Sequence, residues 1–334
     1  MTLSTRTPTA LTAALRDIQS PARHQLGAVS QELWRIVSAD VPLVQEVQQH
    51  LMGMKGKLFR PTLLLLSSAV EERSQPRAVT YAAVIELIHL ATLVHDDAVD
   101  HSALRRGMPT VNSLFSHQVS VIMGDYLYLR ALRELVALGD LDAMRAITEA
   151  SNEMTLGEMR GLSAFDALAF TEDDYETLIR AKTASLFMAA CEVGAICGAP
   201  RHRDALIQFG ERLGMAFQIA DDLLDYTEGQ EMTGKPSGLD LKEHKVTLPL
   251  IAALREMPAS ARARVEALFA DPQPDDDAIS EVVRIVRDHG GLDYARRRGD
   301  QFAREAEDAL ADVPESPART SLVDAIAYVV ERRW

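Results

Sequence analysis

The feature that most constrains the fold is the helical spacing of apolar residues along most of the chain. These residues recur with a period near 3.6 in six long stretches, at residues 79–100, 123–138, 141–159, 175–193, 203–226 and 277–289. The sequence contains no series of strands in which polar and apolar residues alternate. Aromatic residues, which favour strands, make up only 5% of the chain. The sequence therefore predicts an all-α protein.

The breaks between these stretches contain glycine or proline. They fall at residues 107–109, 198–200, 229–238, 271–276 and 313–317. The break at 271–276 holds two prolines and three aspartates, which is typical of an exposed loop and not of a linker between domains. We therefore predict a single domain over residues 1–334, with a loosely ordered segment at residues 1–25.

Charge and composition exclude several classes of protein. The net charge of −14 argues against a nucleic-acid-binding protein, which would normally be basic. The two cysteines, Cys191 and Cys197, match no zinc or redox spacing and are expected to be buried thiols. We expect no membrane span, because no run of 18 apolar residues occurs. The first ten residues lack an apolar signal core, so a cytoplasmic location is expected.

Two acidic clusters of the same form end two of the apolar stretches. The first is Asp96-Asp97-Ala98-Val99-Asp100, and the second is Asp221-Asp222-Leu223-Leu224-Asp225. Acids four residues apart share one face of a helix and repel each other unless a cation lies between them. All-oxygen carboxylate sites suit Mg²⁺, which keeps several waters and binds substrate phosphates. Two such clusters facing each other across a bundle therefore indicate metal-assisted departure of a diphosphate.

Basic residues follow both clusters and could hold the phosphates. A single basic pair is more often an ordinary surface pair, but closeness to the aspartates favours Arg105, Arg106 and Lys235. None of the basic segments has the GxxxxGK[ST] form of a nucleotide-binding loop. A lone histidine on an apolar helix is usually a core residue, so spacing alone gives His89 no clear role.

These motifs together resemble the trans-polyprenyl diphosphate synthases, and the resemblance covers almost the whole chain. The matching segments are both aspartate clusters, Arg105-Arg106-Gly107, Gly56 to Pro61, Gly124-Asp125-Tyr126-Leu127, Lys182-Thr183-Ala184 and Lys245 to Pro249. One departure is Lys55, where the family often has a glycine. The resemblance implies an isoprenoid-synthase bundle around a central active-site cavity.

The resemblance also implies roles for individual residues. Metal ligands would be Asp96, Asp100 and Asp221, supported directly or through water by Asp97, Asp222 and Asp225. The allylic diphosphate would be held by Arg105, Lys182 and Lys235, and isopentenyl diphosphate by Gly56, Lys57, Arg60, His89 and Arg106. Near the reacting carbons or the leaving group would lie Thr183, Gln218 and Lys245, with Lys182. Three Mg²⁺ ions per site and a homodimer are expected from the family, and Arg332 or Arg333 would either close the isopentenyl site or lie in an exposed tail.

Product length is predicted from the residues that precede the first cluster. In the family, bulky residues four and five positions before the first aspartate limit the product, and here these residues are Thr92 and Ala91. Both are small, so the growing chain could pass them and continue along Ile88. The resemblance therefore implies a product of about C35–C50, used for a quinone side chain.

Three other functions stay open from the sequence. A shorter-chain farnesyl or geranylgeranyl diphosphate synthase is the main alternative. A class I terpene cyclase usually has a different second motif, and a non-catalytic partner subunit usually lacks the acidic motifs that are intact here.

Overall fold

The computed structural model describes residues 14–54, 56–162, 167–227 and 238–331, and it is built almost entirely of helices. The amino-terminal and middle helices are α2 (Arg23–Val37), α3 (Pro42–Gly53), α4 (Phe59–Ala69), α5 (Arg77–Val99), α7 (His117–Leu138), α8 (Leu141–Leu162), α10 (Ser185–Gly198) and α11 (Arg203–Thr227). The carboxyl-terminal helices are α14 (Leu248–Glu256), α15 (Ala259–Ala270), α16 (Asp276–Asp288), α17 (Gly291–Ala309) and α18 (Pro317–Glu331). The prediction of an all-α fold is confirmed.

Short elements connect these helices. They are the helices η1 (Ser20–Ala22), α6 (Val111–Leu114), η2 (Ala167–Ala169), α9 (Glu172–Ile179), η3 (Arg180–Ala184), η4 (Pro200–His202) and α13 (Leu239–Lys242), and the strands β1 (Leu104–Arg105) and β2 (Met108–Pro109). The strands form a single antiparallel hairpin, which is the only sheet in the described part of the chain.

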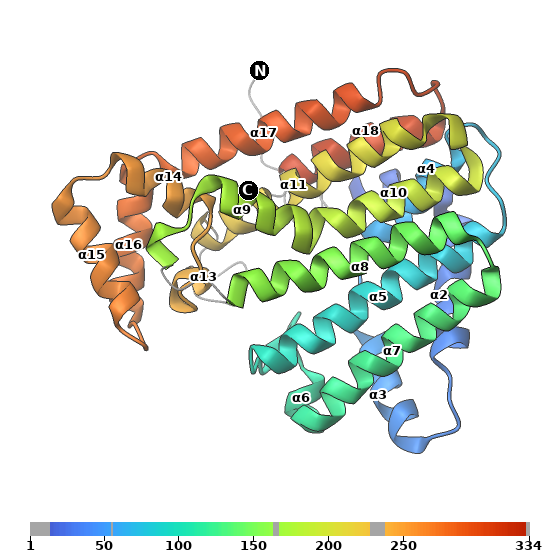
Figure 1. Cartoon of the computed structure of the whole chain (residues 1–334), viewed down its shortest axis with the longest axis horizontal. Coiled ribbons are helices and arrows are strands. Elements are labelled where there is room, and N and C mark those ends of the chain that lie inside the picture. The colour runs from blue at the N-terminus through green and yellow to red at the C-terminus, as the bar shows by residue number, and fades with distance from the viewer. Residues whose placement is uncertain (1–13, 55, 163–166, 228–237, 332–334) are drawn as a thin grey trace.

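The long helices lie side by side as a bundle, and α14, α15 and α16 form a lobe at one end of it (Figure 1). Helix α10 packs on α4, α8 and α11, helix α5 packs on α7, and α17 covers α11. One continuous hydrophobic core runs through the bundle and contains residues from Leu15 to Val329. Both cysteines are buried and free, as the sequence predicted.

Helix α5 is long and apolar enough to cross a membrane, the only such helix among the described residues. Most of its apolar side chains are buried within the bundle, where α5 contacts α2, α4, α7 and α10. Core packing therefore accounts for its composition, because the central helix of a folded domain can be apolar on every side.

Two expectations from the sequence need correction. The segment at residues 1–25 was expected to be loosely ordered, but its described part, residues 14–25, is largely helical and buries Leu15 and Ile18. The helix expected at residues 175–193 is not uniform, because it consists of α9, the π-helical segment η3 and α10. In η3 the Ser185 N–H bonds to the Arg180 carbonyl five residues back, which widens the turn by one residue.

Candidate active site

The first aspartate cluster forms the carboxyl-terminal turn of α5. Asp97 is buried, Asp96 is half-buried, and Asp100 is exposed at the C-cap position. Burial raises the pKa of Asp96, whereas the nearby Lys182 lowers it and the charges of Glu158 and Asp100 raise it further. A cation bound at this helix end would favour the ionised form of Asp96 by the same electrostatic effect that Lys182 has.

A tight hairpin returns the chain to this cluster. Arg106 and Gly107 join the two strands with φ angles of +53° and +76°, the left-handed conformation that a type I′ turn requires at both positions. On the preceding strand, Arg105 Nε donates to both oxygens of Asp97, at 2.9 and 2.8 Å. The buried carboxylate is therefore neutralised by a cation only eight residues away.

The predicted isopentenyl diphosphate residues gather beside this hairpin. A Cβ atom placed on Gly56 would lie 3.2 Å from Arg106 Nη1 and 3.3 Å from Glu86 Oε1, so a side chain there would press on both groups. Burial raises the pKa of Glu86, and the charges of Arg60 and Arg106 oppose that shift. The start of α4 with its preceding loop, helix α5 and the hairpin thus meet here, and the cluster carries a surplus of positive charge.

His89 lies one turn after Glu86 on α5 and faces the same arginines. Burial holds the pKa of His89 well below its usual range, and the charges of Arg60, Arg106 and Arg105 lower it further. The imidazole is therefore neutral at physiological pH, so it can donate one hydrogen bond without adding charge. This environment fits the anion-binding role that the family resemblance implies.

An aromatic cluster connects the basic residues to the second aspartate helix. The rings of Phe59, Phe187 and Phe217 lie 5.2 to 6.1 Å apart, and they come from α4, α10 and α11. The guanidinium carbon of Arg60 lies 4.8 Å from the centre of the Phe187 ring, while Lys57 Nζ lies 5.8 Å from that of Tyr328. These contacts place aromatic faces directly against the cations, where they stabilise positive charge.

The second aspartate cluster lies near the end of α11, and its three acids have three different environments. Asp221 is exposed. Asp222 is buried, accepts from the Tyr175 hydroxyl at 2.5 Å and from Gln218 Nε2 at 2.8 Å, and has its pKa raised by burial. Asp225 accepts from the backbone N–H groups of residues 239 and 240, both at 3.0 Å, and so anchors α13.

Lys182 and Thr183 lie in the π-helical segment η3 and face different partners. Lys182 Nζ pairs with Glu158 Oε2 of α8 at 2.5 Å. Both charges are close enough to Asp96 to shift the pKa of its carboxyl group. Thr183 Oγ1 donates to Gln218 Oε1 at 2.7 Å. The segment therefore brings one residue toward the first cluster and its neighbour toward the second, which fits the frequent use of π-bulges at functional sites.

Lys245 joins the same region from the loop before α14. Its ammonium group pairs with Glu243 at 2.6 Å and is close enough to Asp100 and Asp240 to interact with their charges. The predicted basic residue Lys235 lies outside the described residues, as do Lys55, Arg332 and Arg333. Their predicted roles stay predictions.

The donor set fits a divalent cation that arrives with its substrate. Within the described residues, no group of three or more histidine, cysteine, aspartate or glutamate side chains forms a metal site by itself. Mg²⁺ is commonly held by one or two carboxylates together with waters and substrate phosphates, not by a complete protein cage. Asp96, Asp100 and Asp221, which the family resemblance assigns to the metal, are half-buried or exposed and could take this role.

The predicted chain-length residues lie one to two turns before Asp96 on α5. Ile88 and Ala91 are buried, and Thr92 is half-buried with its hydroxyl donating to the His89 carbonyl at 2.8 Å.

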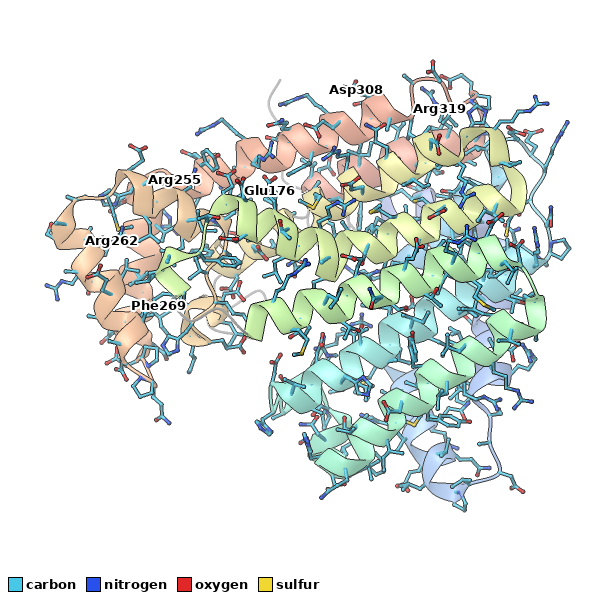
Figure 2. The ribbon with its side chains drawn as sticks, in the orientation of Figure 1. Glu176, Arg255, Arg262, Phe269, Asp308 and Arg319 are labelled. Carbon is cyan, nitrogen blue, oxygen red and sulfur yellow. The ribbon has the colours of Figure 1, made fainter. Side chains whose placement is uncertain are left out.

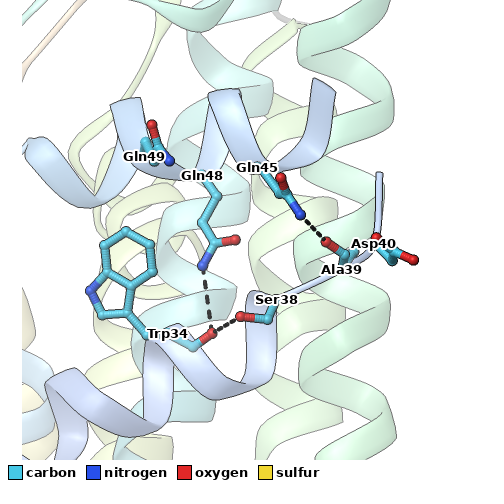
Figure 3. Close-up of a pocket in the computed structure, with 7 residues that line it drawn as sticks. All are labelled: Trp34, Ser38, Ala39, Asp40, Gln45, Gln48 and Gln49. Atoms are coloured by element: carbon cyan, nitrogen blue, oxygen red, sulfur yellow. Dashed lines mark hydrogen bonds between the residues drawn. The ribbon is translucent and has the colours of Figure 1, made fainter. Parts of the chain in front are cut away.

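A separate surface hollow of about 470 Å³ lies between α2 and α3, where Trp34, Gln45 and Gln48 line it (Figure 3). Its lining contains a single charged side chain, Asp40, and none of the predicted site residues.

The glycine of the Gly124–Leu127 motif serves helix packing beneath the first cluster. A Cβ atom on Gly124 would lie 2.2 Å from His95 Nε2, so only glycine lets α7 approach α5 this closely. The His95 ring also lies 3.4 Å from Asp125 Oδ1 and 3.1 Å from the Val121 carbonyl. This motif therefore supports the turn of α5 that carries Asp96.

Three residues at the site carried no clear signal in the sequence. Glu86 is an isolated acid in an apolar stretch, which is the only hint of its position. Tyr175 and Glu158 belong to ordinary amphipathic patterns, and their partners Asp222 and Lys182 are 47 and 24 residues away. Only the packing of α8 and α9 against η3 and α11 reveals them.

Comparison with known proteins agrees with this geometry. Residues 41–286 match the family described as polyprenyl synthetase. The chain is 38% identical to the all-trans-nonaprenyl-diphosphate synthase (geranyl-diphosphate specific) of Rhodobacter capsulatus over 95% of this chain and 98% of that protein.

Solved structures show the same likeness. A decaprenyl diphosphate synthase from Rhodobacter capsulatus superposes with a TM-score of 0.90 at 36% identity, covering 96% of this chain and 99% of that one. A polyprenyl synthase from Caulobacter crescentus, complexed with calcium and isoprenyl diphosphate, also gives a TM-score of 0.90, at 30% identity and with coverage of 96% and 98%. The chain therefore belongs to the polyprenyl synthetase family and is a trans-prenyltransferase of the long-chain polyprenyl diphosphate synthase type.

Proposed function

We propose that the protein condenses isopentenyl diphosphate head-to-tail with an allylic diphosphate to make an all-trans polyprenyl diphosphate of about C35–C50. The observation that carries this proposal is the basic cluster of Gly56, Arg60, His89 and Arg106 beside the first aspartate cluster. A cyclase needs one diphosphate site, whereas a condensing enzyme needs a second one for isopentenyl diphosphate.

In the proposed reaction the C–O bond of the allylic diphosphate breaks and the diphosphate leaves. The double bond of isopentenyl diphosphate then forms the new C–C bond to the allylic cation. The released diphosphate takes up the proton whose loss restores a double bond. Bound Mg²⁺, three ions in the proposal, would neutralise the departing diphosphate as a Lewis acid. Asp96, Asp100 and Asp221 would hold these ions. Asp97, Asp222 and Asp225 would support them by holding the helix ends, because their oxygens accept from protein groups.

The remaining residues bind and orient the substrates. Arg105, Lys182 and Lys235 would hold the allylic diphosphate, and the basic cluster with Lys57 would hold isopentenyl diphosphate. Thr183, Gln218 and Lys245 would lie near the reacting carbons or the leaving group. The aromatic cluster of Phe59, Phe187 and Phe217 would help to keep water away from a cation that would otherwise be hydrolysed.

The test is incubation of the purified protein with Mg²⁺, farnesyl diphosphate and isotopically labelled isopentenyl diphosphate, with products identified by mass spectrometry. A ladder of products that ends between C35 and C50 is expected. Products that stop at C15 or C20 would keep the chemistry but reject the proposed product length. Release of cyclic hydrocarbon, or no incorporation of label, would reject the condensation itself.

We also propose that the protein is a homodimer formed through α7. Ile122, Leu129 and Val136 recur every seven residues on this helix and are 67%, 61% and 68% exposed. A seven-residue apolar repeat is the spacing with which one helix packs on another. Light scattering should give twice the monomer mass, and Leu129→Glu should reduce it to the monomer.

The expected cytoplasmic location and the use of the product for quinone side chains stay predictions.

A further inference from the structure

We propose that Tyr175 is a positioning residue for prenyl transfer, which holds Asp222 so that Gln218 and Thr183 keep one fixed hydrogen-bond direction. The proposal rests on the proposed function, because the orienting role that it assigns belongs to that reaction. Tyr175 itself lies outside both aspartate clusters. It concerns the chemical step and not the binding of metal or diphosphate.

The geometry leaves Asp222 little freedom. Its Oδ2 atom accepts from the Tyr175 hydroxyl at 2.5 Å, and its Oδ1 atom accepts from Gln218 Nε2 at 2.8 Å. Tyr175 is 1% exposed and Asp222 is 6% exposed, so water does not compete strongly for these bonds. Both oxygens of this carboxylate are therefore engaged by protein groups, unlike those of a carboxylate that is directed outward to a ligand.

The chemistry of the three acceptors and donors fixes the direction of the chain of hydrogen bonds. In the structure the Gln218 NH₂ group donates to Asp222 Oδ1, so its carbonyl oxygen is directed away from Asp222. The carbonyl oxygen of Gln218 then lies 2.7 Å from Thr183 Oγ1, and because a carbonyl also only accepts, the threonine hydroxyl must donate. Any further interaction of Thr183 Oγ1 must use its lone pairs.

This direction suits a site where positive charge develops. Oxygen lone pairs held in place before the reaction stabilise a nearby cation without reorganisation at the moment of bond breaking. A terminal amide is broadly two-fold about its last torsion, so an unanchored Gln218 could turn over and present its NH₂ group to Thr183. The Tyr175 bond prevents this indirectly, because it stops the Asp222 carboxylate from rotating away.

Helix α9, which carries Tyr175, is itself fixed from its outer side. Glu172 pairs with Arg255 of α14 at 2.8 Å and accepts from Tyr294 of α17 at 2.9 Å. Glu176 accepts from Arg298 of α17 at 2.6 Å. Figure 2 shows Glu176 on α9 and Arg255 on the neighbouring helix α14. The phenol is therefore held between a rigid outer network and the buried carboxylate.

The test compares Tyr175→Phe with the matched control Tyr81→Phe. Tyr81 is also fully buried, but its hydroxyl has no hydrogen-bond partner among the described residues. It lies near the amino-terminal end of α5, whereas the first aspartate cluster lies at the carboxyl-terminal end. We expect Tyr175→Phe to lower kcat by about tenfold to a hundredfold, the effect of one hydrogen bond to a charged group. The KM for each diphosphate and the Mg²⁺ concentration for half-maximal rate should stay unchanged, and Tyr81→Phe should change none of these quantities.

A double-mutant cycle tests the route of the effect. In a Gln218→Ala background, Tyr175→Phe should cause no further loss of kcat, because the group that it orients is gone. An additive loss, a rise in KM or Mg²⁺ requirement, or an unchanged kcat in the single variant would each overturn the proposal. An inactive wild-type protein would instead reject the proposed function.

A second variant covers the case in which Tyr175→Phe does not fold. Glu172→Gln keeps the phenol but weakens the outer network that holds α9. It should lower kcat by a smaller factor, again with KM and Mg²⁺ requirement unchanged. If kcat of Glu172→Gln stays at the wild-type value, the proposal is wrong.

Discussion

The two aspartate clusters have the same spacing but are stabilised by different chemistry. In both, the second acid is the buried one: Asp97 and Asp222 are each 6% exposed. Asp97 is neutralised by a cation, Arg105, which a two-residue turn brings back from eight residues away. Asp222 is satisfied by neutral donors, a phenol and an amide.

This difference shows that a motif of acidic residues does not contain three equivalent ligands. The buried acid of each cluster holds the architecture, and the half-buried Asp225 does the same by anchoring α13. Asp96, Asp100 and Asp221 are the acids proposed to bind a cation. The first cluster is paired with Arg105 and lies near Lys182, whereas the second is fixed by hydrogen bonds from α9, α11 and α13. The first region therefore depends on charge, and the second depends on precise packing.

The largest effect is expected from replacing one proposed metal ligand in each cluster. Asp96→Asn and Asp221→Asn should each lower kcat/KM by about 10²–10³-fold, since metal-assisted charge stabilisation contributes several kcal/mol. Steady-state assays over a range of Mg²⁺ concentrations would measure this. If one variant kept near-normal activity, the clusters would not share the metal as proposed.

Stability should separate the two buried acids. Asp222→Leu would leave the Tyr175 hydroxyl and the Gln218 amide without their buried acceptor, and we expect a loss of about 2–4 kcal/mol in the free energy of unfolding. The matched change Asp97→Leu should cost only about 1 kcal/mol, because the partly exposed Arg105 can turn to solvent. Urea unfolding compares them, and equal losses would contradict the contrast between the clusters.

Product length should respond only on the helix of the first cluster. Ala91 and Ala216 each lie five residues before the first acid of their cluster, and each is 2% exposed. Replacing either by phenylalanine overpacks the core and should cost about 1–3 kcal/mol of stability. Only Ala91→Phe should shorten the product in a mass-spectrometric assay. An unchanged product in that variant, or an equal shortening by Ala216→Phe, would disprove the pocket along α5.

The smallest effect concerns the pH dependence of the arginine-rich region. Burial, together with the charges of Arg60, Arg105 and Arg106, depresses the pKa of His89 in the folded protein below its ordinary value near 6.5. As the pH falls through that value, the unfolded chain takes up the proton first, so the folded state loses stability. Between pH 7.5 and 5.5 this residue should cost about 1 kcal/mol.

His89→Gln should remove that part of the loss of stability at low pH. The variant keeps Glu86, one turn earlier on α5, so the comparison isolates the histidine. The matched control is His24→Gln, which makes the same substitution at an exposed position of α2. Thermal unfolding midpoints measured across the pH range decide between these outcomes. An identical pH dependence for all three proteins would contradict a His89 side chain that stays neutral in the folded protein.

Much of the fold could be predicted because helix formation depends on local patterns. The apolar period gave the long helices α5, α7, α8 and α11 to within a few residues, apart from the earlier start of α7 at His117. The π-helical segment at Arg180–Ala184 could not be predicted, since its residues fit an ordinary helix and only packing against α8 and α11 favours the wider turn. Gly157 allows that packing, because a Cβ there would lie 3.0 Å from Ala181.

The sequence by itself determined that the protein is helical, that two acidic clusters end apolar helices, and that its motifs resemble one family of prenyltransferases. These properties depend on residue types at short spacings. Only the tertiary structure decided which aspartate is buried, that Lys182 pairs with Glu158, and that Tyr175 holds Asp222. The physical reason is that a buried polar group must find a partner wherever another helix packs against it, and that choice depends on contacts between segments far apart in the chain.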